Sequence, residues 1–335
     1  MQAKVFQKRM LRWYQKTKRD LPWRKTRNPY AIWISEAMLQ QTQVKTVIPY
    51  YERFLQRFAT VQALAKADEQ TVLKLWEGLG YYRRARFLHA GAKKIVSEWH
   101  GVFPSTAEAI RSLPGVGEYM QGAIGSIAFE LPLPLVDGNV KRIFSRIFYG
   151  RWKKQPDDKD FWELARELMP HKSCGDYNQS LMELGATVCT PKNPSCLMCP
   201  VGKACGASSA GKISEASYQS PKTQQPKKYF VALLVERGPK LLLRLRSNEK
   251  LLGGLWEFPM LELLDAKNLP ADIAKHSTYV GRETHTYTHF KQRVEIRTWN
   301  HKVLPKNVSG TWIEKNKIAE LPLSKINQKI LGYLN

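Results

Sequence analysis

The order of apolar and polar residues divides the chain into a helical first part and a mixed second part. Up to about residue 205, apolar residues recur with the spacing of amphipathic helices. Asn28 followed by Pro29 is typical of a helix start, and Ser105 with Glu108 matches a capping box. The pattern predicts an all-α region over residues 1–205.

The pattern changes after residue 205. The next stretch, 206–228, is rich in Ser, Ala, Gln, Pro and Lys and has few apolar residues, as in a linker. Beyond it we expect an α+β domain over residues 229–335. Its predicted elements are strands at residues 229–235, 240–246 and 292–299 and a helix at 324–334.

Length and composition fit a protein of two globular domains. The chain has 335 residues, 43% hydrophobic and 24% charged, which excludes a disordered or fibrous protein. No apolar run approaches the roughly 18 residues of a membrane span, and residues 1–12 lack the apolar core of a signal peptide. We expect a soluble protein of the bacterial cytoplasm, because the first motifs begin within about twenty residues and leave little room for an organelle presequence.

The charge balance points to a polyanionic partner. Lys and Arg number 53 against 29 Asp and Glu, a formal net charge of +24. Residues 1–205 carry +14 and the remainder +10, so the excess is not a basic tail. Nucleic acid is the first candidate, and a basic surface with no partner is the alternative.

Four cysteines lie within 17 residues: Cys189, Cys196, Cys199 and Cys205, with the spacing C-x6-C-x2-C-x5-C. Zinc sites more often pair two C-x2-C units, so the asymmetric spacing favours a four-cysteine iron–sulfur cluster over zinc. Two disulfides are disfavoured in an intracellular chain. Cys174 is left over as a small buried residue.

Two turns offer sites for charged groups. In residues 113–117, Gly115 and Gly117 lie between two predicted helices and could present backbone N–H groups to a phosphate. An ordinary interhelical turn is the alternative. Asp137 precedes a helix that runs to about Phe148, where the helix dipole favours its ionised form, although capping alone would also explain it.

Several motifs together resemble a known family. Leu-Pro-Gly-Val-Gly at 113–117, Val-Asp-Gly-Asn-Val at 136–140 and the four-cysteine spacing resemble the helix-hairpin-helix DNA glycosylases with an iron–sulfur cluster. Arg-Asp-Leu-Pro-Trp-Arg at 19–24 and Trp-Ile-Ser-Glu-Ala-Met-Leu-Gln-Gln-Thr-Gln-Val at 33–44 are similar to the adenine DNA glycosylase, or MutY, family. The resemblance implies a [4Fe-4S] cluster and a monomeric enzyme that acts on double-stranded DNA.

The resemblance also implies the reaction, which is hydrolytic removal of adenine mispaired with 8-oxoguanine or guanine. Glu36 lies in an apolar helical stretch, where desolvation would keep it protonated, and by resemblance it protonates adenine. Asp137 would stabilise the cationic sugar, and Asn139 would orient the sugar or the water. The alternatives are a Glu36 that faces solvent and a non-catalytic iron–sulfur DNA-binding protein, which needs neither carboxylate.

Tyr119 separates two kinds of glycosylase. Bifunctional relatives, which act on oxidised pyrimidines and cleave the strand, carry at this place a lysine that attacks the sugar. A phenol cannot form an imine, so Tyr119 predicts a monofunctional enzyme that leaves an abasic site.

The resemblance assigns DNA contacts as well. The target base must leave the duplex, and Gln41 and Tyr81 match the positions that fill the vacated stack. The residues that correspond to the adenine pocket are Arg19, Leu21, Trp23, Arg24 and Glu183. Phosphate contacts are expected for Gly115 and Gly117 of the turn and for Arg83, Arg84 and Arg86.

The second domain shows a weaker resemblance. Gly-Gly-Leu-Trp-Glu-Phe-Pro at 253–259 is similar to a Nudix fold, but the stretch after it offers only Glu262 and Asp265 for the acidic helix that binds magnesium. Pyrophosphohydrolase activity is therefore not expected. In the adenine glycosylases this domain instead recognises 8-oxoguanine.

A Phe-Ser-His loop makes that recognition in the family, and Tyr287, Thr288 and His289 stand at the matching place. An aromatic ring and a hydroxyl are retained, although the extra methyl group of Thr288 could crowd a close approach. His285 and His289 would not share a face on a strand and loop, so metal binding is not expected there.

Overall fold

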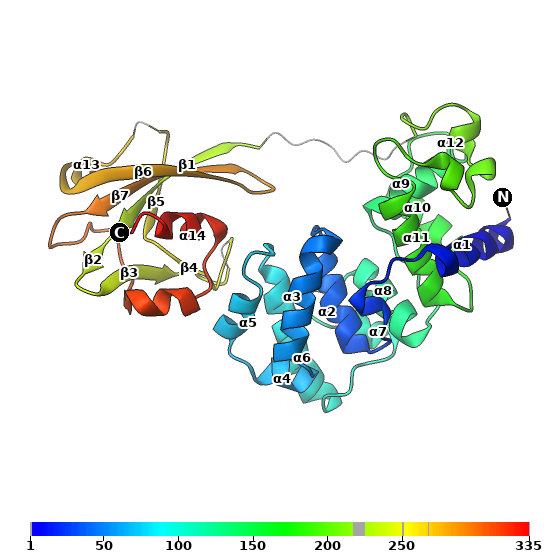
Figure 1. The fold of residues 1–335 in the computed structure, drawn as a ribbon, viewed down its shortest axis with the longest axis horizontal. Helices are drawn as coiled ribbons and strands as arrows, with labels where there is room; N and C mark the ends of the chain where they lie inside the picture. The colour runs from blue at the N-terminus through cyan, green and yellow to red at the C-terminus, as the bar shows by residue number, and fades with distance from the viewer. Residues whose placement is uncertain (1, 217–224, 250, 267, 335) are drawn as a thin grey trace. The chain divides into compact units, whose positions relative to one another are not determined.

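The computed structural model describes residues 2–216, 225–249, 251–266 and 268–334 (Figure 1). The chain forms two compact units. The N-terminal unit comprises residues 1–65 and 90–220, and the C-terminal unit comprises residues 66–89 and 221–335. No helix of the described residues is long and apolar enough to cross a membrane.

The N-terminal unit is helical, as expected, and its helices pack around α2, α8 and α11. The contacts of α11 with α1, α8 and α9, and of α2 with α3 and α8, bring segments far apart in the sequence together. The helices of this unit, with α6 shared between the two units, are α1 (Ala3–Thr17), η1 (Pro22–Arg24), α2 (Pro29–Leu39), α3 (Val44–Arg57), α4 (Val61–Lys66), α6 (Arg83–Trp99), α7 (Ala107–Arg111), α8 (Glu118–Phe129), α9 (Gly138–Ile147), α10 (Asp158–Glu167), α11 (Cys174–Thr187), η2 (Cys196–Met198), η3 (Gly202–Ala204) and α12 (Gly206–Ser209).

Side-chain caps fix where these helices begin. Asn28 Oδ1 accepts hydrogen bonds from the N–H groups of Tyr30 and Ala31, so the predicted cap of α2 is confirmed. The capping box predicted at Ser105 is wrong, because Thr106 is the N-cap of α7 and its hydroxyl accepts from Ala109 N. The cap is one residue later than expected, since either hydroxyl residue could satisfy the free N–H groups.

The predicted linker 206–228 begins with folded chain. Helix α12 contacts α9, and Ala207 is fully buried. Residues 217–224 lie outside the described residues, and the limits of the linker stay a prediction.

In the C-terminal unit, the described strands form two sheets (Figure 1). One has the order β5-β1-β7-β6, with β1 and β7 parallel and the other pairs antiparallel, and the second is built on β3, which pairs with β2, β4 and β8. The bounds are β1 (Lys227–Leu234), β2 (Glu236–Arg237), β3 (Lys240–Leu245), β4 (Trp256–Glu257), β5 (Met260–Leu263), α13 (Ala271–His276), β6 (Ser277–Thr286), β7 (Lys291–Trp299), β8 (Thr311–Glu314), η4 (Lys315–Glu320) and α14 (Lys325–Leu331).

Strand β1 carries the core of this unit on both faces. Ala232 and Leu234 pack into one buried cluster, whereas Val231 and Leu233 pack into another. This period of two follows from the alternation of side chains along a strand. The predicted α+β class is confirmed, and the segment after residue 259 forms strand β5 rather than an acidic helix.

Residues 66–89 belong to the C-terminal unit, although the sequence places them within the helical region. They contain α5 (Glu69–Leu75), and Gln70 Nε2 donates to Gly254 O at 3.0 Å. Glu77 Oε1 accepts from Leu323 N at 2.7 Å. These hydrogen bonds attach residues 66–89 to the turn before β4 and to the segment before α14.

Candidate functional site

A cavity of about 240 Å³ in the N-terminal unit brings together nine of the predicted site residues. Its walls come from the segment after α1, from α2, from the start of α8, from the N-terminus of α9 and from α11. The predicted residues that line it are Arg19, Leu21, Trp23, Arg24, Glu36, Tyr119, Asp137, Asn139 and Glu183. These five segments, which are distant in the sequence, meet because α8 packs against α2 and α11, and α11 packs against α9.

Glu36 is a buried carboxyl group on the cavity wall. Its side chain is 3% exposed, because eight of its neighbours in α2 are buried as well. Burial raises the pKa of Glu36 to about 7, and the nearby Asp137 carboxylate acts in the same direction. Tyr119 Oη donates to Glu36 Oε2 at 3.0 Å, which lowers this pKa, as does Arg24. At neutral pH a large fraction of Glu36 therefore holds its proton.

Tyr119 is half-buried, and its hydroxyl lies between two acceptors. The second is Met182 Sδ, 3.3 Å from Oη. Burial and then the carboxylates of Glu36 and Asp137 raise the pKa of Tyr119 well above its ordinary value. The phenol therefore stays protonated and acts as a hydrogen-bond donor.

Asp137 is the N-cap of α9, as predicted, and both of its oxygens are engaged. Oδ1 accepts from Val140 N at 2.8 Å, and Oδ2 accepts from Asn139 Nδ2 at 2.8 Å. Asn139 Oδ1 in turn accepts from Arg142 Nη2 at 2.9 Å. These hydrogen bonds hold the Asp137 carboxyl group in place at the N-terminus of α9. Sequence analysis missed Arg142, although its position three residues after Asn139 places both on one helix face.

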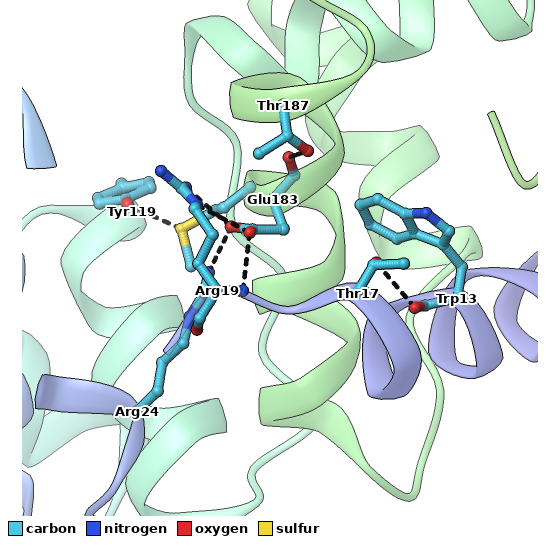
Figure 2. Close-up of polar contacts among 8 residues, drawn as sticks. Trp13, Thr17, Arg19, Arg24, Tyr119, Glu183 and Thr187 are labelled. Carbon is cyan, nitrogen blue, oxygen red and sulfur yellow. Dashed lines mark hydrogen bonds and ion pairs between the residues drawn. The ribbon is translucent and has the colours of Figure 1, made fainter. Parts of the chain in front are cut away.

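Glu183 closes another wall of the cavity as the centre of an ion-pair network. Figure 2 shows Arg19 and Arg24 converging on it: Arg19 Nε lies 2.8 Å from Oε1, and Arg24 Nη2 lies 2.7 Å from Oε2. Burial alone would raise the pKa of Glu183, but the hydrogen bonds from both arginines outweigh it and lower the pKa to about 2. The cavity thus contains two glutamates with opposite pKa shifts.

Gln41 does not line the cavity. It lies in the exposed loop between α2 and α3 with a left-handed backbone, φ 56°. Its neighbours Thr42 and Gln43 line the cavity instead, and sequence analysis did not single them out. Thr42 and Gln43 follow Gln41 within the motif at 33–44, so that motif could have identified them as cavity residues.

The predicted phosphate turn joins α7 to α8. Gly115 has φ +75°, a conformation that favours glycine, and Gly117 is the N-cap of α8. Both glycines are exposed, so their backbone groups can face a ligand.

The four cysteines of the predicted cluster line one small pocket. Arg146, which is 1% exposed, donates from Nη1 to Cys189 Sγ at 3.5 Å. A Cβ atom at Gly202 would lie 2.7 Å from Cys196 O, so the loop has room there only for glycine. In the described part of the chain, no three His, Cys, Asp or Glu side chains are close enough to bind one metal ion. An iron–sulfur cluster binds each cysteine through a different iron, so it requires thiolates that are farther apart than around one zinc ion.

The residues predicted to recognise the lesion lie in the C-terminal unit. Tyr287, Thr288 and His289 form the loop after β6, and Thr288 and His289 are exposed. Tyr287 packs between His285 and Phe290, with ring centroids 4.5 and 5.0 Å away. The Thr288 hydroxyl is hydrogen-bonded to Tyr81 Oη.

Of the three arginines expected to contact phosphates, Arg84 and Arg86 are turned toward the protein. Arg86 Nη1 donates to Asn248 O at 2.7 Å, and Arg84 Nη2 donates to Gly80 O at 3.2 Å. Arg83 is exposed, with its guanidinium 4.8 Å from the Phe87 ring. The sequence could not predict these directions, because they depend on carbonyl groups supplied by turns.

The chain is similar in sequence and fold to known proteins. The profile of the HhH-GPD superfamily of base excision DNA repair proteins matches residues 34–171, and the profile of the NUDIX domain matches residues 230–333. The adenine DNA glycosylase of Arabidopsis thaliana is 36% identical over 86% of this chain and 56% of its own length. The chain therefore spans little more than half the length of that relative.

Two further comparisons are more complete. The adenine DNA glycosylase of Buchnera aphidicola subsp. Baizongia pistaciae is 33% identical over 99% of this chain and 92% of its own length. The solved structure of a thermostable thymine-DNA glycosylase is 32% identical, with a TM-score of 0.58, and covers 62% of this chain and 97% of that one. The resemblance predicted from the sequence is thereby confirmed, and the chain belongs to the adenine DNA glycosylase family, with a helical HhH-GPD region and a C-terminal NUDIX domain.

Proposed function

We propose that the chain hydrolyses the N-glycosidic bond of adenine mispaired with 8-oxoguanine or guanine in double-stranded DNA and leaves an abasic site. The observation that carries the proposal is that Glu36, which is buried and partly protonated, lines the same cavity as Asp137. Breaking this bond places electrons on the base and positive charge on the sugar. Two carboxyl groups in different protonation states can stabilise both charges.

In this mechanism Glu36 is the general acid. The N-glycosidic bond breaks with its electron pair on adenine, and the proton of Glu36 neutralises the departing base. Tyr119 holds the carboxyl group in place through its 3.0 Å hydrogen bond. Because the group is desolvated, its pKa of about 7 lies close to the working pH, where a general acid is most effective.

Asp137 stabilises the sugar cation, and Asn139 orients the sugar or the attacking water. The bond from Asn139 Nδ2 to Asp137 Oδ2 fixes the two side chains relative to each other. Water then bonds to the sugar carbon, and its proton returns to the Glu36 carboxylate, which restores the acid for the next cycle. Fixed charges of this kind need no reorganisation during the reaction, which is why they lower its barrier.

Tyr119 supports a monofunctional enzyme. A phenol at this place cannot form the imine that precedes strand cleavage. Sodium borohydride should therefore trap no stable adduct with DNA in high yield, and strand scission should require alkali. A high yield of trapped adduct would contradict the proposal.

The decisive test uses a duplex with a single adenine opposite 8-oxoguanine. Glu36→Gln and Asp137→Asn should each abolish adenine release, measured as alkali-dependent strand scission, and should leave duplex binding intact. Asp20→Asn, a change at an exposed carboxylate of the segment before the cavity, is the control and should keep full activity. If both site variants retained full turnover, the assignment of Glu36 and Asp137 would be wrong.

The cysteine pocket fits a [4Fe-4S] cluster held by Cys189, Cys196, Cys199 and Cys205. Such a cluster has no open ligand position, so it supplies structural support or redox sensing rather than Lewis-acid chemistry. Arg146 would stabilise the negative charge of the thiolates. Iron analysis and visible absorbance test this assignment: about four irons per chain should be found, and Cys199→Ala should lower that content. A preparation with bound zinc and no iron would contradict it.

Lesion recognition is proposed for the loop of Tyr287, Thr288 and His289, together with the wedge residues Gln41 and Tyr81. Thr288 and His289 are exposed, and Tyr81 is 40% exposed although it is large and apolar. Thr288→Ala should reduce the preference for adenine opposite 8-oxoguanine over adenine opposite guanine. An unchanged ratio of the two rates would exclude this role.

A further inference from the structure

A strained turn in the C-terminal unit presents Tyr81. Gly78 and Gly80 have φ of +100° and +72°, and Tyr81 itself has φ +48°. Glycine adopts such angles freely, but for a bulky residue they are uncommon and persist only where neighbouring contacts impose them. The side chain of Tyr81 is nevertheless 40% exposed; its hydroxyl is hydrogen-bonded to Thr288, and further contacts hold its ring and backbone.

Arg84, in the first turn of α6, supplies those contacts. Its guanidinium carbon lies 5.3 Å from the Tyr81 ring centroid on one side and 5.4 Å from the Trp76 ring centroid on another. Its Nη2 donates to Gly80 O at 3.2 Å and approaches Leu79 O at 3.4 Å. One planar cation thus contacts two rings and two carbonyl groups of the turn.

The surroundings of Arg84 keep it in this position. Trp76 is fully buried and donates from Nε1 to the same Gly80 carbonyl at 3.0 Å. Burial lowers the pKa of Arg84 to about 10, which still leaves it charged at neutral pH. The guanidinium is engaged in hydrogen bonds and ring contacts within the turn, so it is poorly placed to neutralise a DNA phosphate.

We propose that Arg84 is a positioning residue that holds the Tyr81 ring and the backbone of residues 79–81 in the conformation needed to enter the DNA stack. The proposal rests on the proposed function of Tyr81 as a wedge. Arg84 would therefore act on the reaction through Tyr81 and would make no phosphate contact of its own.

The first test is made on the full chain without DNA, so that it does not depend on the role of Tyr81. Arg84→Met should speed hydrogen exchange at the amides of residues 80–84 by roughly tenfold or more, because local opening becomes easier. Arg83→Met removes the same charge from an exposed neighbour and should leave exchange there unchanged. Equal exchange in Arg84→Met and the unsubstituted protein would overturn the proposal.

The second test is a double-mutant cycle on adenine excision opposite 8-oxoguanine. Arg84→Met should slow single-turnover excision by roughly tenfold, the size of a lost desolvated cation–π contact, and should cause no further loss when Tyr81 is already Ala. An equal loss in both backgrounds would overturn the proposal. If Tyr81→Ala alone had no effect, the wedge role would fail, while the exchange experiment would still decide the positioning role.

Arg84→Lys distinguishes positioning from phosphate binding. It also replaces Arg84→Met in both tests if Arg84→Met does not fold. Lysine keeps the charge but lacks the planar fork that contacts both rings and both carbonyl groups at once, so Arg84→Lys should remain impaired in both tests. The dependence of duplex binding on salt should also keep its slope. Rescue by lysine, or a slope reduced by about one in Arg84→Met, would show a phosphate contact and overturn the proposal.

Discussion

At the scale of single residues, two glutamates of one cavity have pKa values shifted in opposite directions. Glu36 has a pKa raised to about 7, mainly by burial. Glu183 is also buried, but two arginines bind it, and its pKa is lowered to about 2. Because Glu183 stays ionised, it is suited to holding Arg19 and Arg24 in the wall, whereas Glu36 can carry a proton.

The first prediction concerns the pH dependence of adenine excision. The acid form of Glu36 is required, so the single-turnover rate should be constant below about pH 7 and fall about tenfold per pH unit above it. Tyr119→Phe removes a hydrogen bond that lowers this pKa, so the fall should move to higher pH. A rate that rises through neutral pH would contradict the role of Glu36.

The second prediction concerns stability. The depressed pKa of Glu183 means that its ion pairs stabilise the fold above about pH 4.5 and lose that effect as the pH falls toward about 2. Glu183→Gln leaves two arginines without their anion and should cost about 3 kcal/mol at pH 7, a fall in Tm of roughly 5 to 10 °C. Its control is Asp20→Asn, an exposed pair, which should leave Tm unchanged. Equal Tm values for both variants would show that the network does not stabilise the fold.

At the scale of elements, the site depends on how closely α11 approaches the start of α9. A Cβ atom at Gly185 of α11 would lie 2.6 Å from Asn139 Cβ, so only glycine fits there. Arg142 strengthens the same junction, with Nη2 donating to Gly185 O at 2.8 Å and Nε to Cys189 O at 2.8 Å. The position of Asn139, and through it of Asp137, is therefore set by helix packing.

The third prediction tests this junction. Gly185→Ala should displace Asn139, break its hydrogen bond to Asp137 and lower the single-turnover rate by roughly tenfold or more, with little effect on duplex binding. The control for folding is Gly138→Ala, whose added Cβ meets no atom within 4 Å and which should keep Tm. Full activity of Gly185→Ala would mean that the packing is looser than the structure shows.

At the scale of the whole molecule, charge and organisation act together. The net charge of +24 is spread over both halves of the chain, as expected of a protein that follows a DNA backbone. The loop that holds Tyr81 belongs to the C-terminal unit, together with Tyr287, Thr288 and His289. The residues proposed to recognise the lesion thus lie largely in one unit, and the residues proposed to catalyse the reaction lie in the other.

The fourth prediction follows from the charge. Each phosphate that the protein neutralises releases counterions, so the logarithm of the duplex binding constant should fall linearly with the logarithm of salt concentration. With about six to ten phosphate contacts, affinity should fall by about 10³ to 10⁵ between 50 and 200 mM salt. Fluorescence anisotropy of a labelled duplex measures this, and a flat titration would refute an electrostatic interface.

The sequence by itself determined the helical and mixed halves, the cap at Asn28, the Asp137 helix start and the cysteine spacing, because these depend on neighbours within a few residues. The recognised motifs also predicted most of the cavity wall. Tertiary structure alone decided the lowered pKa of Glu183, the inward direction of Arg84 and the membership of residues 66–89 in the C-terminal unit. Burial and hydrogen-bond partners come from segments distant in the chain, and no local pattern specifies which segments will meet.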